Sequence, residues 1–202
     1  MWSLEWVSAV VSASRSVWGW ISTRRSAPAI QIDQIRQSPL FEGTGQPIYW
    51  ITQIWFTNQP AKPKESSVAK EVTTRLDFFD FDFPDPRLTV HGQWALATAP
   101  DHAGHIGTAP AIDIPPGLLP VKLMTLLKYP ENAAAYAYAA ENLLRYPDGR
   151  HPDFELAAGT YTLRVTLMGQ NVNQEFWFDV ESSGVGTQPT VARTTFHGTV
   201  RS

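Results

Sequence analysis

The chain crowds four aspartates into one short stretch: Asp77, Asp80, Asp82 and Asp85. Carboxylate oxygens are the ligands that Ca²⁺ prefers, so this stretch is a candidate for metal chemistry. Its spacing matches no calcium loop, and Asp80 and Asp82 alternate with phenylalanines as the solvent-facing residues of an amphipathic strand do. We therefore expect a solvated strand face here rather than a calcium site.

Two histidines, His102 and His105, follow Asp101 in a glycine-containing stretch. Imidazoles at this spacing can share a divalent metal. No third ligand stands nearby in the sequence, and His91 or His151 would approach only through the fold. A solvated loop is the expectation, and we predict no metal and no other cofactor.

The sequence carries no pattern typical of an enzyme. Serine is plentiful, but none stands in a Gly-x-Ser-x-Gly elbow, and no His, Asp and Ser occur in an order typical of a hydrolase. Glycine patterns that cradle phosphate are missing as well. The chain has no cysteine, which removes thiolate chemistry, disulfides and Cys-based zinc sites. These patterns predict a non-enzymatic protein.

Composition and charge narrow the remaining classes. The net charge of −3 and the pI near 5.9 leave no basic surplus to neutralise a phosphate backbone, so no nucleic-acid partner is expected. An apolar content of 43% with 17% charged residues excludes a disordered chain. The 16 prolines and 13 glycines favour strands joined by many turns. We expect one all-β domain with short appendages.

The first segment, residues 1–26, is rich in tryptophan and aliphatic side chains. At about 100° per residue its polar side chains gather on one arc, which predicts an amphipathic helix with a wide apolar face. Such a helix suits the headgroup region of a membrane, with tryptophans on the apolar face and arginines at its end. The residues predicted to contact a membrane or a partner protein are Trp2, Trp6, Trp18, Trp20, Arg24 and Arg25.

Other roles for this segment stay open. A membrane span would place Arg15 in hydrocarbon, at a cost of about 3 kcal/mol. If the helix does span, Arg24 and Arg25 on its C-terminal side would leave the domain in the cytoplasm, which is the location we predict. A cleaved signal peptide lacks the usual positive start, and packing on protein is the remaining alternative. The oligomeric state is not predicted.

From Ala29 onward the hydrophobic period changes from about 3.6 to 2, which indicates strands. A first strand opens at Ile30, and Ile48–Thr57 is apolar on both faces, as a central strand is. Alternation over Val72–Phe78 slips by one at Phe79, which predicts a β-bulge or a corner between sheets. Further strands are expected over 88–96, 111–114 and 121–129. Residues 133–144 are ambiguous between helix and strand, and we favour a strand.

The most regular alternation runs from Phe154 to Val180. It places one set of side chains inward: Tyr161, Leu163, Val165, Leu167, Phe176, Phe178 and Val180. Residues 169–173 supply the glycine and asparagines of a turn, so this stretch predicts a β-hairpin. The tail, residues 182–202, lacks sustained periodicity and is expected to be flexible.

Leu156, Gly159 and Tyr161, followed by the hairpin, resemble the end of an immunoglobulin-like or fibronectin type III-like domain. The resemblance implies an antiparallel β-sandwich of about seven to eight strands over residues 27–181, with Tyr161 as a tyrosine corner. Leu163 stands where antibody-type domains have a cysteine, so the disulfide-bearing branch is excluded. The segment 1–26 joined to one sandwich is also similar to uncharacterised bacterial membrane-associated proteins.

Three aromatic residues on the less apolar phase of their strands, Tyr49, Trp55 and Trp177, are candidates for a ligand surface. Alternatively, the N-terminal helix or the long loops cover this face. The sequence thus predicts a non-enzymatic interaction or structural module, held at a membrane or in an assembly by residues 1–26. The alternative is a soluble carbohydrate- or protein-binding accessory domain that uses exposed aromatics.

Overall fold

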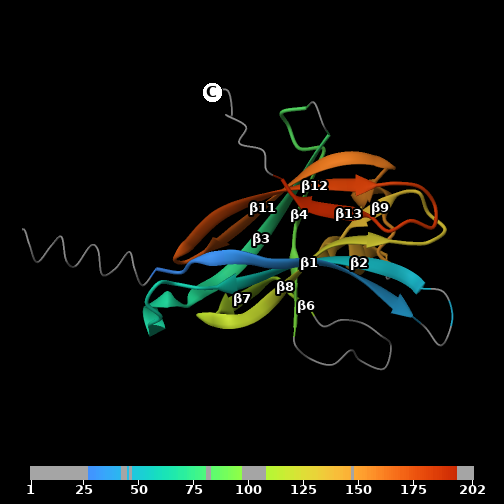
Figure 1. Ribbon diagram of the computed structural model, residues 1–202. Coiled ribbons are helices and arrows are strands. Elements are labelled where there is room, and N and C mark those ends of the chain that lie inside the picture. The colour runs from blue at the N-terminus through green and yellow to red at the C-terminus, as the bar shows by residue number, and fades with distance from the viewer. Residues whose placement is uncertain are drawn as a thin grey trace, which may run out of the picture.

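The computed structural model describes residues 27–41, 45, 47–80, 83–96, 108–146 and 148–194. These residues form two antiparallel β-sheets that pack face to face (Figure 1). The predicted all-β class and sandwich architecture are confirmed. The predicted N-terminal helix, residues 1–26, lies outside the described residues.

One sheet, here called sheet A, has seven strands in the order β1-β2-β8-β5-β6, with β9 paired to β8 and β10 paired to β9. Its strands are β1 (Ile30–Phe41), β2 (Pro47–Asn58), β5 (Gln93–Ala95), β6 (Thr108–Ala109), β8 (Gly117–Lys128), β9 (Ala135–Ala137) and β10 (Glu155–Leu156). The strand β2 lies between β1 and β8, so the predicted central strand is confirmed.

The second sheet, sheet B, has six strands in the order β13-β12-β11-β3-β4, with β7 paired to β3. Its strands are β3 (Ala69–Asp80), β4 (Leu88–His91), β7 (Ala111–Ile114), β11 (Gly159–Gly169), β12 (Val172–Ser182) and β13 (Thr190–Arg193). The hairpin β11–β12 is in continuous register from Gly159 opposite Ser182 to Gly169 opposite Val172. With both sheets counted, the described part of the chain holds more than the seven to eight strands expected, and several of them are very short.

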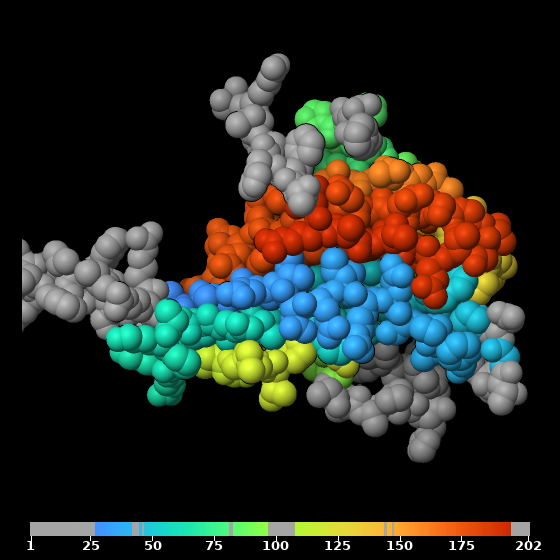
Figure 2. Space-filling model, in the orientation of Figure 1, coloured from blue at the N-terminus to red at the C-terminus, as the bar shows by residue number. Residues whose placement is uncertain are grey.

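The edges of the two sheets lie next to each other on one side of the sandwich. Figure 2 shows the blue residues of β1 against the red residues of β13, and Gln37 Nε2 donates a hydrogen bond to the carbonyl oxygen of Pro189. Along β1 the pairing with β2 shifts between Ile32 and Gln34, which leaves Asp33 without a partner on β2. The strand β1 is thus an interrupted edge strand.

The core lies between the sheets and is formed by alternate residues of the long strands. The inward set predicted for β11, from Tyr161 to Leu167, is buried as expected. Trp94 of β5 is fully buried, its ring meets Phe56 edge to face at 6.0 Å, and its Nε1 donates to the carbonyl oxygen of Val72 at 2.8 Å. This hydrogen bond satisfies the indole nitrogen inside an otherwise apolar layer.

The chain crosses from sheet B to sheet A at Gly92, which separates β4 from β5. Its backbone nitrogen donates to the carbonyl oxygen of Thr74 at 3.0 Å. A Cβ at this position would lie 2.3 Å from Thr74 Oγ1 and 3.0 Å from Leu123 Cδ1. Glycine is therefore required for the close approach of the two backbones.

The bulge or corner predicted at Phe78 and Phe79 is not present. The strand β3 continues to Asp80 in unbroken register with β11. The phase of the sequence slips because both phenylalanines are buried, Phe78 in the core and Phe79 on the outer face beneath Trp177, 5.8 Å from it between ring centroids. Burial on both faces hides the alternation from the sequence pattern.

Residues 133–144 are a strand only in part. They contain β9, which pairs with β8, followed by the short helix α2 (Ala140–Arg145). Short 3₁₀ turns, η1 (Glu65–Ser67) and η2 (Pro152–Phe154), connect other strands. Beyond Glu181, the segment expected to be a flexible tail includes β13, which pairs with β12.

One buried side chain, Asn58 at the end of β2, joins three segments at the end of the sandwich where the described chain begins. Its Oδ1 accepts a hydrogen bond from the backbone nitrogen of Ala29 at 2.9 Å. Its Nδ2 donates to the carbonyl oxygens of Ser67 at 2.7 Å and Ile114 at 2.9 Å. Asn58 thereby connects the start of β1 with the η1 loop and with β7 of the opposite sheet.

Candidate functional site

A second, smaller core covers the outer face of sheet A. It consists of apolar and tyrosine side chains from β2, β8, β9 and the residues beside them: Ile51, Met124, Leu127, Tyr129, Tyr136 and Tyr138. Tyr49 and Leu143 of α2 pack against it. The ring of Tyr129 lies 5.6 Å from that of Tyr49 and 6.3 Å from that of Tyr136. This tyrosine cluster is the largest gathering of phenol groups in the described residues.

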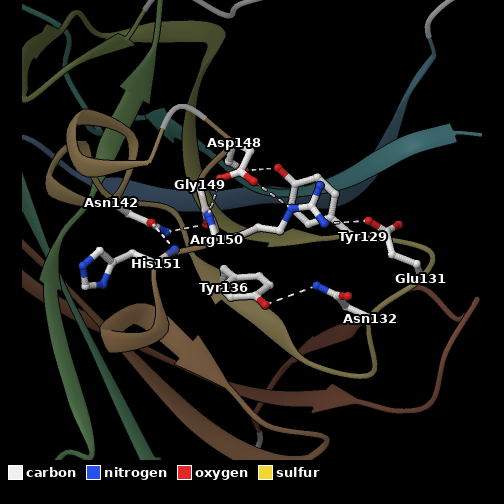
Figure 3. A network of polar contacts seen from close by, with 9 residues as sticks. All are labelled: Tyr129, Glu131, Asn132, Tyr136, Asn142, Asp148, Gly149, Arg150 and His151. Atoms are coloured by element: carbon white, nitrogen blue, oxygen red, sulfur yellow. Dashed lines mark hydrogen bonds and ion pairs between the residues drawn. The ribbon is translucent and has the colours of Figure 1, made fainter.

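Arg150 lies over the ring of Tyr129 in the tyrosine cluster, as Figure 3 shows. Its guanidinium carbon is 4.1 Å from the ring centroid of Tyr129. The same side chain forms ion pairs with Glu131 at 2.7 Å and with Asp148 at 3.0 Å. Tyr129 Oη also donates a hydrogen bond to the carbonyl oxygen of Asp148. Arg150 thus closes the outer side of the cluster with its charge compensated.

Asn142 of α2 holds the loop that carries this network. The side chain is fully buried, and its Nδ2 donates to the carbonyl oxygens of Ala137 at 3.1 Å and Gly149 at 2.7 Å. Its Oδ1 accepts from the backbone nitrogen of His151 at 3.1 Å. The positive φ of 70° at Gly149 lets the chain reverse here. The loop is therefore fixed by backbone contacts that do not require a ligand.

An open hollow of about 460 Å³ lies beside the network, between Glu131, Asn132, Tyr136 and Glu155. Two of its polar groups already have partners. The carboxylate of Glu131 is paired with Arg150, and Asn132 Nδ2 donates to Tyr136 Oη at 3.2 Å. This geometry stabilises the loop and presents no activated nucleophile.

Burial raises the pKa of Tyr129 and that of Tyr138 to about 12. Both phenols are therefore neutral at physiological pH and are weak proton acceptors. The pKa values of Tyr49 and Tyr136 are raised as well, again through burial. A tyrosine that acts as a catalytic base or nucleophile needs a pKa below its ordinary value near 10, so the chemistry of the cluster is that of a packed, neutral aromatic layer.

We expect these tyrosines to make the protein sensitive to alkali. Unfolded tyrosine ionises near pH 10, whereas Tyr129 and Tyr138 stay neutral in the folded state up to about pH 12. The free energy of unfolding is therefore highest below pH 10 and decreases as the pH rises through 12. The total decrease is several kcal/mol, because each pKa unit corresponds to about 1.36 kcal/mol.

Urea unfolding at a series of pH values measures this decrease, and phenolate absorbance at each pH reports the ionisation of the tyrosines. A Tyr138→Phe variant should show a shallower decline, and a flat profile would contradict the assignment.

Lys128, at the end of β8, is a buried cation that the sequence did not reveal. It is fully buried, and its Nζ donates to Ser182 Oγ at 3.2 Å and to the carbonyl oxygen of Ala133. Burial lowers its pKa, so its contribution to stability increases with pH, opposite to that of the tyrosines. In the sequence, the apolar run before Lys128 predicts a buried strand, but it does not show whether the ammonium group at its end points inward or to solvent.

A row of side chains crosses the outer face of sheet B, from Trp177 on β12 through Arg164 on β11 and Asp77 on β3 to Thr89 on β4. Arg164 donates to Asp77 Oδ2 through Nε at 3.0 Å and Nη2 at 2.8 Å. Thr89 Oγ1 donates to Oδ1 at 2.7 Å, and Arg75 Nε donates to Oδ2 at 3.0 Å. The carboxylate of Asp77 is thus fully engaged.

The pKa of Asp77 reflects this environment. Burial alone would raise it, but hydrogen bonds from Thr89 and Arg164 and the charges of Arg164 and Arg75 outweigh burial and lower the pKa below its ordinary value. The guanidinium carbon of Arg164 also lies 5.4 Å from the ring of Trp177. Asp77 is therefore a charged structural residue. The guanidinium group of Arg164 connects it to the ring of Trp177.

Trp55 also lies on the outer face of sheet A, where Gln53 connects it to Met124 of the tyrosine cluster. Arg36 on β1 and Lys122 on β8 place their charged groups 4.9 Å and 4.6 Å from its ring centroid. Trp55 Nε1 donates to Gln53 Oε1 at 3.2 Å. Neither cation has a carboxylate partner among the ion pairs of the described residues. This surface combines an aromatic ring with uncompensated positive charge.

The three aromatic residues predicted as a ligand surface do not come together. Trp55 lies on the outer face of sheet A and Trp177 on that of sheet B, so the sandwich separates them. Tyr49 is half-buried in the tyrosine cluster. The predicted contact residues at Trp2, Trp6, Trp18, Trp20, Arg24 and Arg25 lie outside the described residues.

The aspartates and histidines considered as possible metal ligands are also dispersed in the part of the chain that the structure describes. Asp80 pairs with Arg87 at 3.4 Å, and His91 lies 3.6 Å from Glu141. Asp82, His102 and His105 lie outside the described residues. In the part of the chain that the structure covers, no three His, Asp or Glu side chains are grouped as metal ligands.

None of the described helices is long and apolar enough to cross a membrane. The described surface has three recognisable features, namely the tyrosine cluster with Arg150, the row through Asp77, and the cations beside Trp55. No family model, curated protein or solved structure matches this chain.

Proposed function

We propose that this protein is a non-enzymatic interaction or structural module, held at a membrane by residues 1–26. The sequence of this segment supports the proposal through its tryptophans and its terminal Arg24 and Arg25. In the sequence, Arg24 and Arg25 stand between the apolar stretch and the sandwich, which favours a cytoplasmic location for the domain if the segment spans. In the other form of the same proposal, residues 1–26 bind a partner protein in an assembly instead of a membrane.

The observation that carries the proposal is how firmly the chain is attached where the segment joins the sandwich. Ala29 donates its backbone nitrogen to Asn58 Oδ1 at 2.9 Å, and its carbonyl oxygen accepts from the backbone nitrogen of Gln59 at 2.8 Å. Ile30 then starts β1 opposite Asn58. A segment that joins the fold through such contacts, with no intervening linker after residue 29, would hold the sandwich close to whatever residues 1–26 bind.

Vesicle flotation tests this proposal. We expect the full chain to float with phosphatidylcholine vesicles, and more so when they contain phosphatidylglycerol, because the arginines attract anionic headgroups. Replacing Trp2, Trp6, Trp18 and Trp20 together by Ser should leave the protein at the bottom of the gradient, with unchanged thermal unfolding. Equal flotation of the two proteins would contradict lipid anchoring through these residues. A full chain that stays at the bottom and forms oligomers would favour the protein-partner form.

The cations beside Trp55 favour a second candidate, a soluble accessory domain that binds a carbohydrate or protein. Arg36 and Lys122 flank the ring, so an anionic ligand is the chemistry that this surface suits best. The flotation assay separates the two functions. A soluble accessory domain remains at the bottom of the gradient whether or not the four N-terminal tryptophans are present.

For the finer class of the sandwich, we propose an immunoglobulin-like fold. Tyr161 Oη donates to the carbonyl oxygen of Ala157 at 2.9 Å, as the hydroxyl of a tyrosine corner does. The chain passes here from β10 in sheet A to β11 in sheet B, so the bond stabilises a crossing between sheets. The strand order also supports this class, since β1-β2-β8-β5 packs on β12-β11-β3, in the order of the ABED and GFC sheets of an immunoglobulin-like sandwich.

A further inference from the structure

We propose that Leu118 and Leu119 form a second membrane contact that fixes the orientation of the sandwich on the bilayer. This inference rests on the proposed membrane anchoring through residues 1–26. The two leucines lie at the start of β8, where its pairing with β2 is interrupted. Their position follows from the register of these two strands.

The interruption is a β-bulge in which β8 has more residues than β2 between two paired positions. Phe56 of β2 pairs with Val121, and Asn58 pairs with Gly117. Residues 118–120 of β8 therefore stand opposite Thr57 alone. A bulge of this kind pushes the extra residues away from the sheet and re-aims their side chains.

The bulge exposes two adjacent leucines to an unusual degree. Leu118 is 79% exposed and Leu119 is 83% exposed, the highest values of any large hydrophobic residue in the described chain. Pro120 follows the pair directly and limits the conformations of Leu119, and Gly117, at a φ of 146°, precedes Leu118. A short apolar projection of this kind is well suited to enter the interface of a bilayer.

The leucines lie close to the point where the N-terminal segment joins the sandwich. Asn58 pairs with Ile30 of β1 on one side and with Gly117 of β8 on the other. Two strand spacings of about 4.8 Å therefore separate the start of β1 from the start of β8, roughly 10 Å in all. Figure 1 shows the blue start of β1 and the yellow-green start of β8 at the same end of the sandwich. A membrane that binds residues 1–26 would be within reach of both leucines.

Charge at this end is balanced. The exposed lysines Lys62, Lys64 and Lys70 are accompanied by the exposed carboxylates of Glu65, Glu71 and Asp113. Lys122 and Arg36, which lie beside Trp55 further along the same strands, are cations that have no carboxylate partner among the ion pairs of the described residues. The contribution of the leucines should be apolar and should persist in high salt and on zwitterionic vesicles, unlike a purely electrostatic contact.

The first test compares vesicle partitioning of the full chain with that of an L118S/L119S variant. Because both side chains are exposed, the thermal unfolding midpoint should not change. We expect the variant to bind phosphatidylcholine vesicles at least roughly tenfold more weakly, in low and in high salt. Val185→Ser is the matched control, because Val185 is 64% exposed and Gly186 beside it bonds to Pro130, beyond the other end of β8. Equal partitioning of wild type and L118S/L119S would overturn the inference while leaving the anchoring intact.

The second test locates the side chain directly. The chain has no cysteine, so a single Leu119→Cys or Val185→Cys substitution can carry an environment-sensitive fluorophore at a unique position. With vesicles, the probe at residue 119 should shift to the blue and be quenched by brominated acyl chains, and the probe at residue 185 should not. A blue shift at residue 119 without vesicles, abolished by the four N-terminal Trp→Ser substitutions, would show that residues 1–26 cover the leucines and would overturn the inference.

Failure of the anchoring itself gives a different result. In that case the wild-type chain does not bind vesicles at all, and both proposals are overturned together. If wild-type protein binds but the probe at residue 119 is neither shifted nor quenched, only the second contact is wrong. The two proposals therefore fail distinguishably.

Discussion

Replacing Asn58 by Asp should lower the free energy of unfolding by about 3–5 kcal/mol, because two buried carbonyl oxygens lose their donor. The Asn58 side chain is fully buried, and its Nδ2 serves the carbonyl oxygens of Ser67 and Ile114. An aspartate of the same shape offers no N–H and would place a negative charge against both oxygens. The loss is large because Asn58, Ser67 and Ile114 are all fully buried.

Urea unfolding of the full chain, followed by circular dichroism, measures this effect. Asn173→Asp is the matched control, since Asn173 is exposed on β12 and the same chemical change should cost less than about 0.5 kcal/mol. The N58D variant should regain stability as the pH falls, because protonation of a buried carboxyl restores one donor and removes the charge. Similar stabilities of the two variants would show that Asn58 does not join the segments as described.

Replacing Gly92 by Ala should cost about 2–3 kcal/mol through overpacking at the crossing between the sheets. The added Cβ would lie 2.3 Å from Thr74 Oγ1 and 3.3 Å from Leu76 Cγ. Threonine is stiff about χ1, and both neighbours are buried in the core, so neither can move away without disturbing other contacts. Thermal and urea unfolding measure the loss.

A second substitution tests the cause. Thr74 Oγ1 is buried without a hydrogen-bond partner among the described residues, so its removal leaves no other group unsatisfied. In a double-mutant cycle, Thr74→Ala should recover part of the stability that Gly92→Ala loses. Gly45→Ala is the control, because its Cβ would meet no atom within 4 Å. Additive effects of the two core substitutions would contradict the proposed clash.

The sequence predicted the long strands well because each has a pattern that local physics determines. In β11, alternation of Tyr161, Leu163 and Val165 with polar residues matches burial on one face only. Around Phe79 the pattern was misleading, because the register with β11 and β12 brings Arg164 and Trp177 over the outer face. That contact joins residues far apart in the chain and has no local signature.

The region after Tyr138 shows the same limit. Its helix α2 depends on Asn142, whose partners are the carbonyl oxygens of Ala137 and Gly149 and the nitrogen of His151. Nothing in the alanine-rich sequence indicates that an asparagine would be fully buried there. The exposed Leu118 and Leu119 were visible in the sequence, but their significance depends on the bulge opposite Thr57, which only the pairing of β2 and β8 reveals.

The interrupted edge at β1 has a consequence for how these molecules behave when they are crowded together. A long, regular edge strand offers unpaired amides to any other chain and promotes sheet-to-sheet aggregation. Here Asp33 stands unpaired at the register shift, and Pro39 further along lacks an amide hydrogen. A second copy therefore cannot extend sheet A along the whole of β1. The interrupted edge of β1 is therefore a poor site for the growth of sheet A between molecules at high concentration.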